Sequence, residues 1–380
     1  MIVFEIKIQK KGVTMGDNNT RYREIRNALD KTYPVQPQGN AARHLNTLAA
    51  MVSGIVGSGS TQLPKIADKV PAEAKSASVE KRISRWIDNN NVTWKRFFLP
   101  YAEALLLNLG LKEIVLAVDV SDIGRGCRTL IVNVIYKKRA LPLAWIAAEG
   151  GKGHFSEENH IDLIKQVHEM IPESAQRVVL VGDGEFDGIN LQKTLEGWGW
   201  YYVCRTSPNI QIGMNDEVYH VGIIGSFIPE GFHIAAENIL FTRKGYGPVT
   251  VIAWRGEGYA EPVYLVTNMK SPEDAMDYYS KRFRIETFFS DQKSRGFHLN
   301  KSHLSDPERL SRLMIAACLA YIWIVFLGTL AVTQGWIKII HRSDRCDLSL
   351  FQLGLKLLNY FLDHDISVPV AFHIINQKYE

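Results

Sequence analysis

The sequence EIVLAVDVSD, residues 113–122, decides the fold, because an unbroken apolar run leads directly into an acidic residue. Asp119 follows five apolar residues, so its carboxylate would emerge from a buried strand. A buried carboxylate costs free energy unless something binds it. A second run, RVVLVGDGEFDG at residues 177–188, leads in the same way through Gly182 to Asp183. Because ligands gather at the carboxyl ends of parallel strands, both acids are candidates for one site.

The order of the patterned segments around these acids predicts an α/β fold. We expect strands at residues 114–120, 128–136, 140–148, 177–183 and 200–205, and helices at residues 157–171 and 187–197. Three consecutive strands followed by alternating helix and strand indicate a ribonuclease H-like core, a mixed sheet covered by helices. In such a core the centre of the first strand lies beside the end of the fourth. Asp119 and Asp183 would then face one cleft.

A third segment, PEDAMDYYSKRFRIETFFSDQKSR at residues 272–295, is predicted to form a single helix. Its start is marked by Pro272 after a capping Ser271, and its end by Gly296. Four residues of this signature segment stand out: Tyr279, Arg282, Glu286 and Lys293. Their offsets of 0, 3, 7 and 14 residues place them within an arc of about 60° on one helical face.

A helical face with an aromatic ring, two cations and a carboxylate suits a metal ion bound beside a phosphate backbone. The same spacing also fits a solvated amphipathic helix with incidental charges. A single acid at a strand end is, similarly, more often a turn or cap residue. The combination of Asp119, Asp183 and Glu286 favours a functional site over both alternatives.

Together these residues resemble the catalytic triad and the Tyr-Arg-Glu-Lys signature of bacterial insertion-sequence DDE transposases. The resemblance is to the insertion sequence four family, which includes the transposon-five type of cut-and-paste transposase, and it covers residues 40–362. It implies end nicking, a hairpin intermediate and strand transfer into target DNA. It also implies a homodimer that binds double-stranded terminal inverted repeats, in the cytoplasm of a bacterium and associated with its nucleoid.

Three acids are the ligands that two-metal phosphoryl transfer requires, since carboxylates hold a pair of divalent ions about 4 Å apart. Hard oxygen ligands select Mg²⁺ or Mn²⁺, so two such ions are expected in the active site. We assign Asp119 as the bridge between them, Asp183 to one ion and Glu286 to the other. The resemblance implies that Tyr279, Arg282 and Lys293 contact phosphates near the transposon end. Such contacts position DNA and carry little sequence information.

The chain departs from the family pattern after both aspartates. Val120 and Ser121 stand where the family usually has Gly-Thr, and Gly184 stands where many members have arginine. A DNA contact by that arginine therefore cannot be transferred to this chain. Nearby acids that could replace the chosen ligands are Asp122, Glu185 and Asp187.

With 380 residues and 46% apolar content, the chain can bury a large core. We predict a six-part organisation: an N-terminal extension at residues 1–20, a helical DNA-binding domain at 21–110, core parts at 111–205 and 271–333, a β-rich insertion at 206–270, and a C-terminal helical region at 334–380. Whether Met1 or Met15 is the native start stays open.

Basic residues concentrate in the N-terminal part, where residues 1–110 carry 16 Lys and Arg against 9 Asp and Glu. We expect helices at residues 41–56 and 64–68, the second capped by Ser60, and a helix capped by Ser76 or Ser78, with helix-turn-helix potential. DNA contacts are assigned there to Lys81, Arg82 and Arg85, and in the segment at 341–358 to Arg342 and Arg345. A surface helix with ordinary charges is the alternative for the first group.

The stretch at residues 206–269 is predicted to be β-rich, with strands near 217–224, 232–242, 249–255 and 262–268. It resembles the insertion domain of the family, where an aromatic side chain can stack on a base extruded during hairpin formation. The candidates are Trp254, Tyr259 and Tyr264. Each is also a plausible packed strand residue, and the sequence does not choose among them.

Three other functional classes compete with a transposase. Residues 313–332 are 20 uncharged, mainly apolar positions that could cross a bilayer, although a helix buried on all sides has the same hydropathy. We therefore predict no membrane partner. A ribonuclease H-like endonuclease without strand transfer and a catalytically silent DNA-binding derivative are the other two.

The four cysteines lie far apart and no glycine-rich phosphate loop is present, so neither a zinc ribbon nor nucleotide hydrolysis is indicated.

Overall fold

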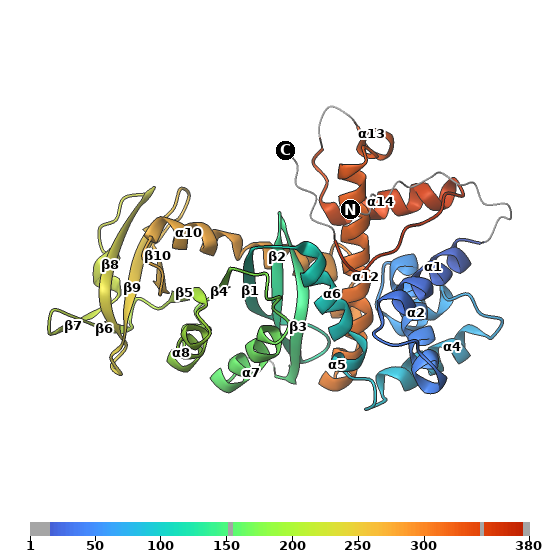
Figure 1. The fold of residues 1–380 in the computed structure, drawn as a ribbon, viewed down its shortest axis with the longest axis horizontal. Helices are drawn as coiled ribbons and strands as arrows, with labels where there is room; N and C mark the ends of the chain where they lie inside the picture. Colours follow the sequence, from blue (N-terminus) through green and yellow to red (C-terminus); the bar gives the residue numbers. More distant parts are fainter. Residues whose placement is uncertain (1–15, 151–154, 343–345, 375–380) are drawn as a thin grey trace.

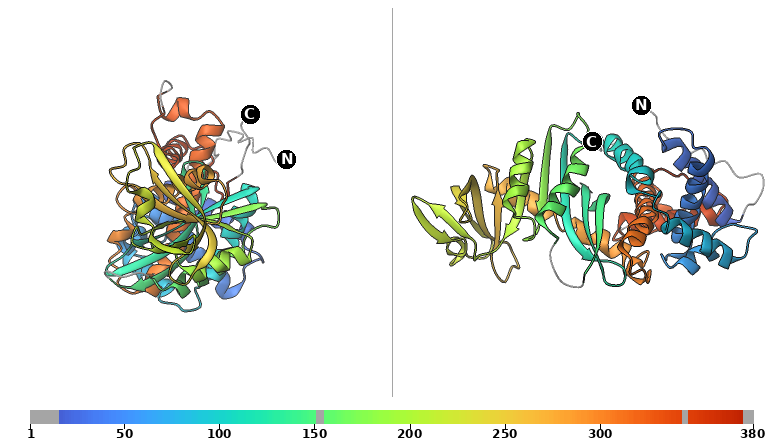
Figure 2. Two further views of the ribbon diagram at one scale, coloured as in Figure 1. Left: turned by 90° about the vertical axis from the view of Figure 1, so that its left-hand side faces the viewer. Right: turned by 90° about the horizontal axis from the view of Figure 1, so that it is seen from below.

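The computed structural model describes residues 16–150, 155–342 and 346–374. Met1, Met15 and Arg345 therefore lie outside the described residues. The molecule is elongated: a β-rich lobe lies at one end, the N-terminal helices lie at the other, and the core lies between them (Figures 1 and 2).

A single ten-stranded sheet runs from the core into the β-rich lobe, in the order β3-β2-β1-β4-β5-β10-β9-β8-β6-β7. The strands are β1 (Glu113–Asp122), β2 (Cys127–Tyr136), β3 (Arg139–Glu149), β4 (Arg177–Gly182), β5 (Tyr201–Thr206), β6 (Gln211–Met214), β7 (Glu217–His220), β8 (Phe232–Phe241), β9 (Tyr246–Arg255) and β10 (Val263–Thr267). Strands β1, β2 and β3 are antiparallel, whereas β1, β4 and β5 are mutually parallel. This confirms the five strands predicted for the core, and the mixed sheet is consistent with a ribonuclease H-like arrangement.

Helices surround the sheet and build the end of the molecule that carries the N-terminal part. They are α1 (Asp17–Thr32), α2 (Gly39–Ser58), α3 (Leu63–Asp68), α4 (Ser76–Ile87), α5 (Trp94–Phe97), α6 (Leu99–Leu109), α7 (Glu157–His168), α8 (Ile189–Gly197), α9 (Gly222–Gly225), α10 (Pro272–Lys281), α11 (Arg284–Gln292), α12 (Pro307–Thr333), α13 (Ile337–Ile340) and α14 (Leu350–Asp363), with a 3₁₀ turn at Leu299–Lys301. The predicted helices at 41–56, 64–68, 157–171 and 187–197 correspond to α2, α3, α7 and α8.

The predicted caps of two N-terminal helices are wrong. Helix α4 begins at Ser76 with Lys75 at the cap position and no side-chain cap, so neither Ser76 nor Ser78 caps it. The cap position of α3 is Gln62, and Ser60 instead accepts a hydrogen bond from the Gln62 backbone. Both helices are held by packing of their apolar faces, so a capping side chain is not required at either start.

The β-rich lobe is joined to the core by backbone hydrogen bonds. Strand β10 pairs antiparallel with β5, with Leu265 opposite Arg205. One strand in the lobe was not predicted: β6 forms a hairpin with β7 through Asn215 and Asp216, both with positive φ, as a two-residue turn of this kind requires. The predicted strand at 217–224 is too long, because β7 ends at His220 and the chain turns into α9.

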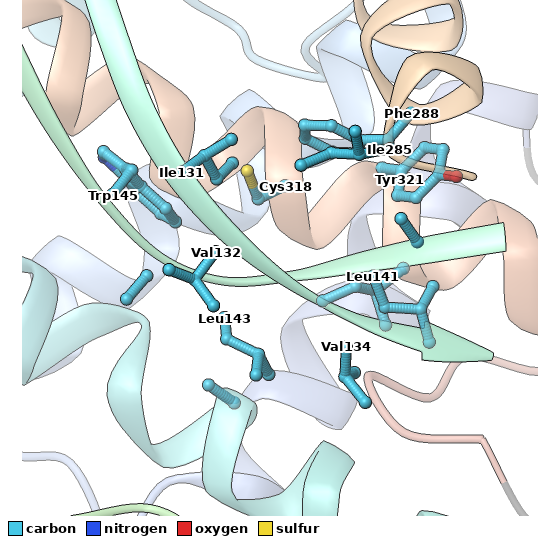
Figure 3. Close-up of a cluster of buried hydrophobic side chains, with 14 of the residues drawn as sticks. Ile131, Val132, Val134, Leu141, Leu143, Trp145, Ile285, Phe288, Cys318 and Tyr321 are labelled. Atoms are coloured by element: carbon cyan, nitrogen blue, oxygen red, sulfur yellow. The ribbon is translucent and has the colours of Figure 1, made fainter. Parts of the chain in front are cut away.

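Helix α12 is the central helix of the core rather than a membrane span. It is long and apolar enough to cross a bilayer, but 83% of its most apolar window is buried inside the protein. It packs against β3 and against α14. Figure 3 shows Ile131 of β2 beside Cys318 of α12, whereas Val132 lies near Leu143. This two-sided burial explains why most residues of β2, and of α12 after Arg312, are apolar.

The signature segment forms two helices, not the single helix predicted. Helix α10 begins as expected, with Ser271 accepting a hydrogen bond from the Asp274 backbone. The helix ends at Lys281, and a tight turn follows in which the Arg282 amide donates to the Tyr279 carbonyl. Helix α11 then ends at Gln292, so Lys293 lies just beyond it.

Gly296 closes the segment by a close backbone approach. A Cβ atom at this position would lie 1.9 Å from the carbonyl oxygen of Asp291. The chain can fold back there only with glycine, and the Phe297 amide donates to that same carbonyl.

Candidate active site

Strand β1 presents Asp119 and Ser121 on one face, because side chains two residues apart in a strand point the same way. The parallel neighbour β4 ends at Gly182, which is paired with Val118. Asp119 and Asp183 each follow the last paired residue of these adjacent strands. The predicted neighbourhood of the two acids is therefore present in the structure.

The turn after β4 fixes the Asp183 side chain. A Cβ atom at Gly182 would lie 2.8 Å from Cβ of Phe186, so glycine allows the chain to turn back tightly. The Asp183 carbonyl accepts a hydrogen bond from the Phe186 amide, and its carboxylate oxygen Oδ1 accepts one from the Glu185 amide at 3.0 Å. These bonds hold one carboxylate oxygen in the turn.

Arg282 lies between the other two acids. Its Nη1 donates to Oδ2 of Asp119 at 3.1 Å, and its Nη2 lies 3.5 Å from Oε1 of Glu286. The side chains of Asp119 and Arg282 are largely buried, at 15% and 11% exposure, whereas Glu286 is 59% exposed. The turn between α10 and α11 thus directs a guanidinium into the space between two carboxylates.

Burial raises the pKa of Asp119 to about 6. The positive charge of Arg282 opposes this shift, and the negative charges of Asp183 and Glu286 add to it. The contacts of Arg282 join Asp119 to Glu286, and strand pairing brings Asp183 next to Asp119. A perturbed acid beside other charged side chains is typical of functional sites.

Lys293 reaches the same face of β1. Its Nζ donates to Oγ of Ser121 at 2.6 Å, and burial lowers the pKa of the lysine while the charges of Asp122 and Asp119 raise it. The Ser121 hydroxyl, at a position where the family usually has threonine, is therefore a direct partner of the signature lysine.

Tyr279 is placed more deeply than a surface phosphate contact requires, with 2% of its area exposed. Burial raises the pKa of its phenol, while the charges of Arg282 and Arg205 lower it. The Arg282 guanidinium lies 5.8 Å from the centre of its ring. Tyr279 therefore packs beneath Arg282 rather than projecting from the surface.

Arg205 is a site residue that the sequence reasoning missed. It follows Cys204, the residue of β5 that pairs with Gly182, and so lies next to Asp183 at the carboxyl ends of two parallel strands. Its side chain is exposed. It supplies a cation beside Asp183, where Gly184 replaces the family arginine. The signal that could have found it is the rule that neighbouring parallel strands end at one edge.

The three rival acids have other partners. Asp122 is exposed and forms an ion pair with Arg128 at 3.1 Å. Glu185 is buried and accepts a hydrogen bond from the Phe155 backbone, with His160 at 3.3 Å. Asp187 accepts one from Thr206 at 2.6 Å. Each rival acid therefore has a partner in this structure, and none of these partners is Arg282.

The remaining candidates lie away from this cluster. Three of them, Lys81, Arg82 and Arg85, are exposed on α4, while Ile83 and Trp86 are buried as expected. Arg342 forms an ion pair with Asp347 at 2.7 Å. The aromatic candidates in the lobe are half-buried: Trp254 and Tyr259 pack on each other with ring centres 5.3 Å apart, and Tyr264 packs against α9 through Gly225.

The acidic cluster has the donor chemistry for divalent ions but is closed in this conformation. Among the described residues, no group of three acid, histidine or cysteine side chains is arranged to hold a metal ion. The cause is visible in the contacts, since Arg282 holds Asp119 and Glu286 by one guanidinium. Carboxylate oxygens remain the ligands that Mg²⁺ and Mn²⁺ prefer, so the residues fit such ions once the arginine moves.

Comparison with known families identifies a domain of the chain. A family model described as the transposase DDE domain matches residues 121–323, slightly more than half of the chain. The match includes Asp183 and Glu286 and begins two residues after Asp119. No curated protein matches the chain.

Proposed function

This chain belongs to the transposase DDE domain family, and we propose that it catalyses cut-and-paste transposition of a bacterial insertion sequence of the insertion sequence four family. Members of the DDE family are metal-dependent enzymes that act on DNA. The observation that carries the proposal is the arrangement of three acids: Asp119 and Asp183 follow paired residues of β1 and β4, and Arg282 contacts both Asp119 and Glu286.

The three acids would hold two Mg²⁺ or Mn²⁺ ions, with Asp119 as the bridging ligand. When bound, such ions activate an attacking oxygen and stabilise the departing one in an in-line displacement. Glu286 is the exposed member of the set, and so its side chain has the most freedom to move toward the other two acids. Asp183 is already oriented by its turn.

Cations around the acids would hold the DNA backbone. Arg205 and Lys293 lie on either side of the pair Asp119 and Asp183, and Arg282 becomes available when it leaves the acids. Guanidinium groups bind phosphate oxygens in a bidentate manner, whereas the ammonium group acts as a point charge. Tyr279, buried beneath Arg282, would orient that arginine.

The proposed sequence is hydrolytic nicking, attack of the freed 3′-hydroxyl on the opposite strand to give a hairpin, hairpin opening and strand transfer. Its partners are terminal inverted repeats and target DNA, bound by a homodimer in the bacterial cytoplasm. The exposed cations of α4, namely Lys81, Arg82 and Arg85, would contact the repeat. Any base-stacking side chain would come from the β-rich lobe.

The test uses the DNA that flanks the coding region, whose matching inverted repeats supply the end substrate. The full chain is incubated with labelled end DNA, Mg²⁺ or Mn²⁺, and a circular target. We expect cutting and joining by the natural protein. Asp183→Ala should lower both by about 1,000-fold or more while end binding is kept, because metal ions supply several kcal/mol of transition-state stabilisation.

The matched control is Asp162→Ala, which removes an exposed acid of α7. It should cut and join as the natural protein does. Cutting without joining would replace the proposal with an endonuclease. Binding without cutting, unchanged by Asp183→Ala, would replace it with a catalytically silent DNA-binding protein.

A further inference from the structure

Two arginines at the start of α12 reach the end of α4. Arg312 is buried, and its guanidinium donates to the carbonyl oxygens of Ile87 at 2.9 Å and Val92 at 3.1 Å. A further hydrogen bond of 2.9 Å goes to the side-chain oxygen of Asn90. The arginine therefore occupies the turn in which α4 ends, where helical carbonyl groups lack partners of their own.

Arg309, one turn earlier on α12, reaches the same place from the solvent side. Its Nε lies 2.7 Å from Oδ1 of Asp88, and its Nη2 donates to Oγ of Ser84 at 3.4 Å. Two positive charges at the carboxyl end of α4 also interact favourably with the helix dipole. We call Arg309 and Arg312 the α4 clamp.

Helix α12, which carries both arginines, also contacts α11, the helix of Glu286. Gln292, the last residue of α11, donates from its side chain to the Ala317 carbonyl of α12 at 3.2 Å. Glu286 lies on the same short helix. Helix α12 itself is buried in the core, so it links α4 and α11 through one rigid element. Meanwhile Lys81, Arg82 and Arg85 lie exposed on α4.

We propose that the α4 clamp fixes α4 relative to the catalytic acids and thereby determines which phosphodiester bond of a bound DNA end is cut. This inference rests on the proposed function. A DNA end held by the cations of α4 would present one bond to Asp119, Asp183 and Glu286 as long as the angle between α4 and α12 is constant. Adjacent phosphates along a strand lie only about 3.4 Å apart in rise, so a small tilt of α4 brings a neighbouring bond into the site. Arg309 and Arg312 are thus positioning residues.

The test maps the cut at single-nucleotide resolution on labelled end DNA, with end binding measured in parallel at increasing salt. Arg312→Lys keeps the charge but cannot make the forked contacts with Ile87 and Val92. Asp88→Asn weakens the outer contact at a partly exposed position and should leave the fold intact. The control is Lys165→Gln, which removes a cation from an exposed ion pair on α7.

We expect the natural protein and the control to cut at one position. Arg312→Lys, and to a smaller extent Asp88→Asn, should cut at positions displaced by one or more nucleotides while binding the same DNA with the same salt dependence. If both variants cut only at the natural position, the inference is overturned and the proposed function stands. If Arg312→Lys does not fold, Asp88→Asn decides the question. If the natural protein binds the end without cutting it, the proposed function itself fails, which is a distinct result.

Discussion

Two arginines, one at the junction of α4 and α12 and one in the active site, are about equally buried but differ in how their hydrogen bonds are satisfied. Arg312 is 7% exposed and donates four hydrogen bonds, two of them to backbone carbonyls. Arg282 is 9% exposed as a whole residue and makes two contacts with carboxylates, at 3.1 and 3.5 Å. Within the described part of the chain, its Nε atom has no acceptor.

This difference separates a structural arginine from one that is available to a ligand. Buried polar groups in folded proteins nearly always have partners. The Nε of Arg282 is one of several arginine nitrogens without a hydrogen-bond partner in the described part of the chain, and the Nε of Arg309 is another; Arg282 differs in that both of its acceptors are carboxylates of the candidate site. At the junction, all three nitrogens of Arg312 meet acceptors of the protein itself. In the candidate active site, Arg282 lies between two acids that we propose as metal ligands, and its guanidinium has the geometry to bind a phosphate.

The largest expected effect is a loss of stability when Arg312 is replaced, because its guanidinium donates four hydrogen bonds. Arg312→Met would leave the carbonyls of Ile87 and Val92 buried without a donor, which costs about 3 kcal/mol of stability in total. The free energy of unfolding, measured with urea by fluorescence and by circular dichroism, should fall by that amount. A loss below about 1 kcal/mol would mean that water replaces the arginine, and the contrast with Arg282 would disappear.

The second effect concerns catalysis rather than stability. Arg282→Gln should lower the rate of end cutting by about 100-fold, because a cation that stabilises transition-state charge is lost. In the same variant, Mn²⁺ binding measured by titration without DNA should become about tenfold tighter, since no guanidinium competes for Asp119 and Glu286.

Lys281→Gln is the control for that prediction, because it removes the neighbouring cation, which pairs with Asp277 on α10. Its Mn²⁺ affinity should equal that of the natural protein. Weaker Mn²⁺ binding by Arg282→Gln would show that the arginine organises the acids instead of competing for them.

A third buried arginine, Arg139, has one short ion pair, with Asp291 of α11 at 2.8 Å. Burial raises the pKa of Asp291 to about 6 although Arg139 opposes the shift. Because the folded state holds this proton more tightly than the unfolded state, Asp291 favours folding at low pH, and the contribution is lost as pH rises through about 6.

The pH dependence can be measured as a difference between two proteins. The free energy of unfolding of the natural protein, relative to that of Asp291→Asn, should be about 1 kcal/mol higher at pH 5 than at pH 7.5. Urea unfolding of both proteins at the two pH values tests this. An equal difference at both pH values would show that the pair does not titrate in this range.

The comparison also shows which parts of the structure can be predicted from sequence. The core strands and the proximity of Asp119 to Asp183 were predictable, because an apolar run of four or five residues leads into each acid and such runs are local properties of the sequence. The break between α10 and α11 was not, since KRFRI contains neither glycine nor proline. There the contacts of Arg282 with acids on other elements accompany a turn that intrinsic propensity does not signal.

Arg205 and Ser121 were missed as site residues for a related reason. Each is an ordinary residue in its own strand, and its role depends on what the fold brings to it. Ser121 gains its importance from Lys293, which is 172 positions away in the sequence. Arg205 lies beside Asp183 because β5 pairs with β4. Such contacts between residues far apart in the sequence become visible only in the folded structure.

Backbone hydrogen bonds between β10 and β5 join the β-rich lobe to the core sheet. A slip of one residue would turn every side chain of β10 to the opposite face, so the two strands can tilt together but cannot slide past each other. The lobe therefore keeps a fixed register with the strand whose end carries Arg205, and through that strand with β4, which leads into Asp183.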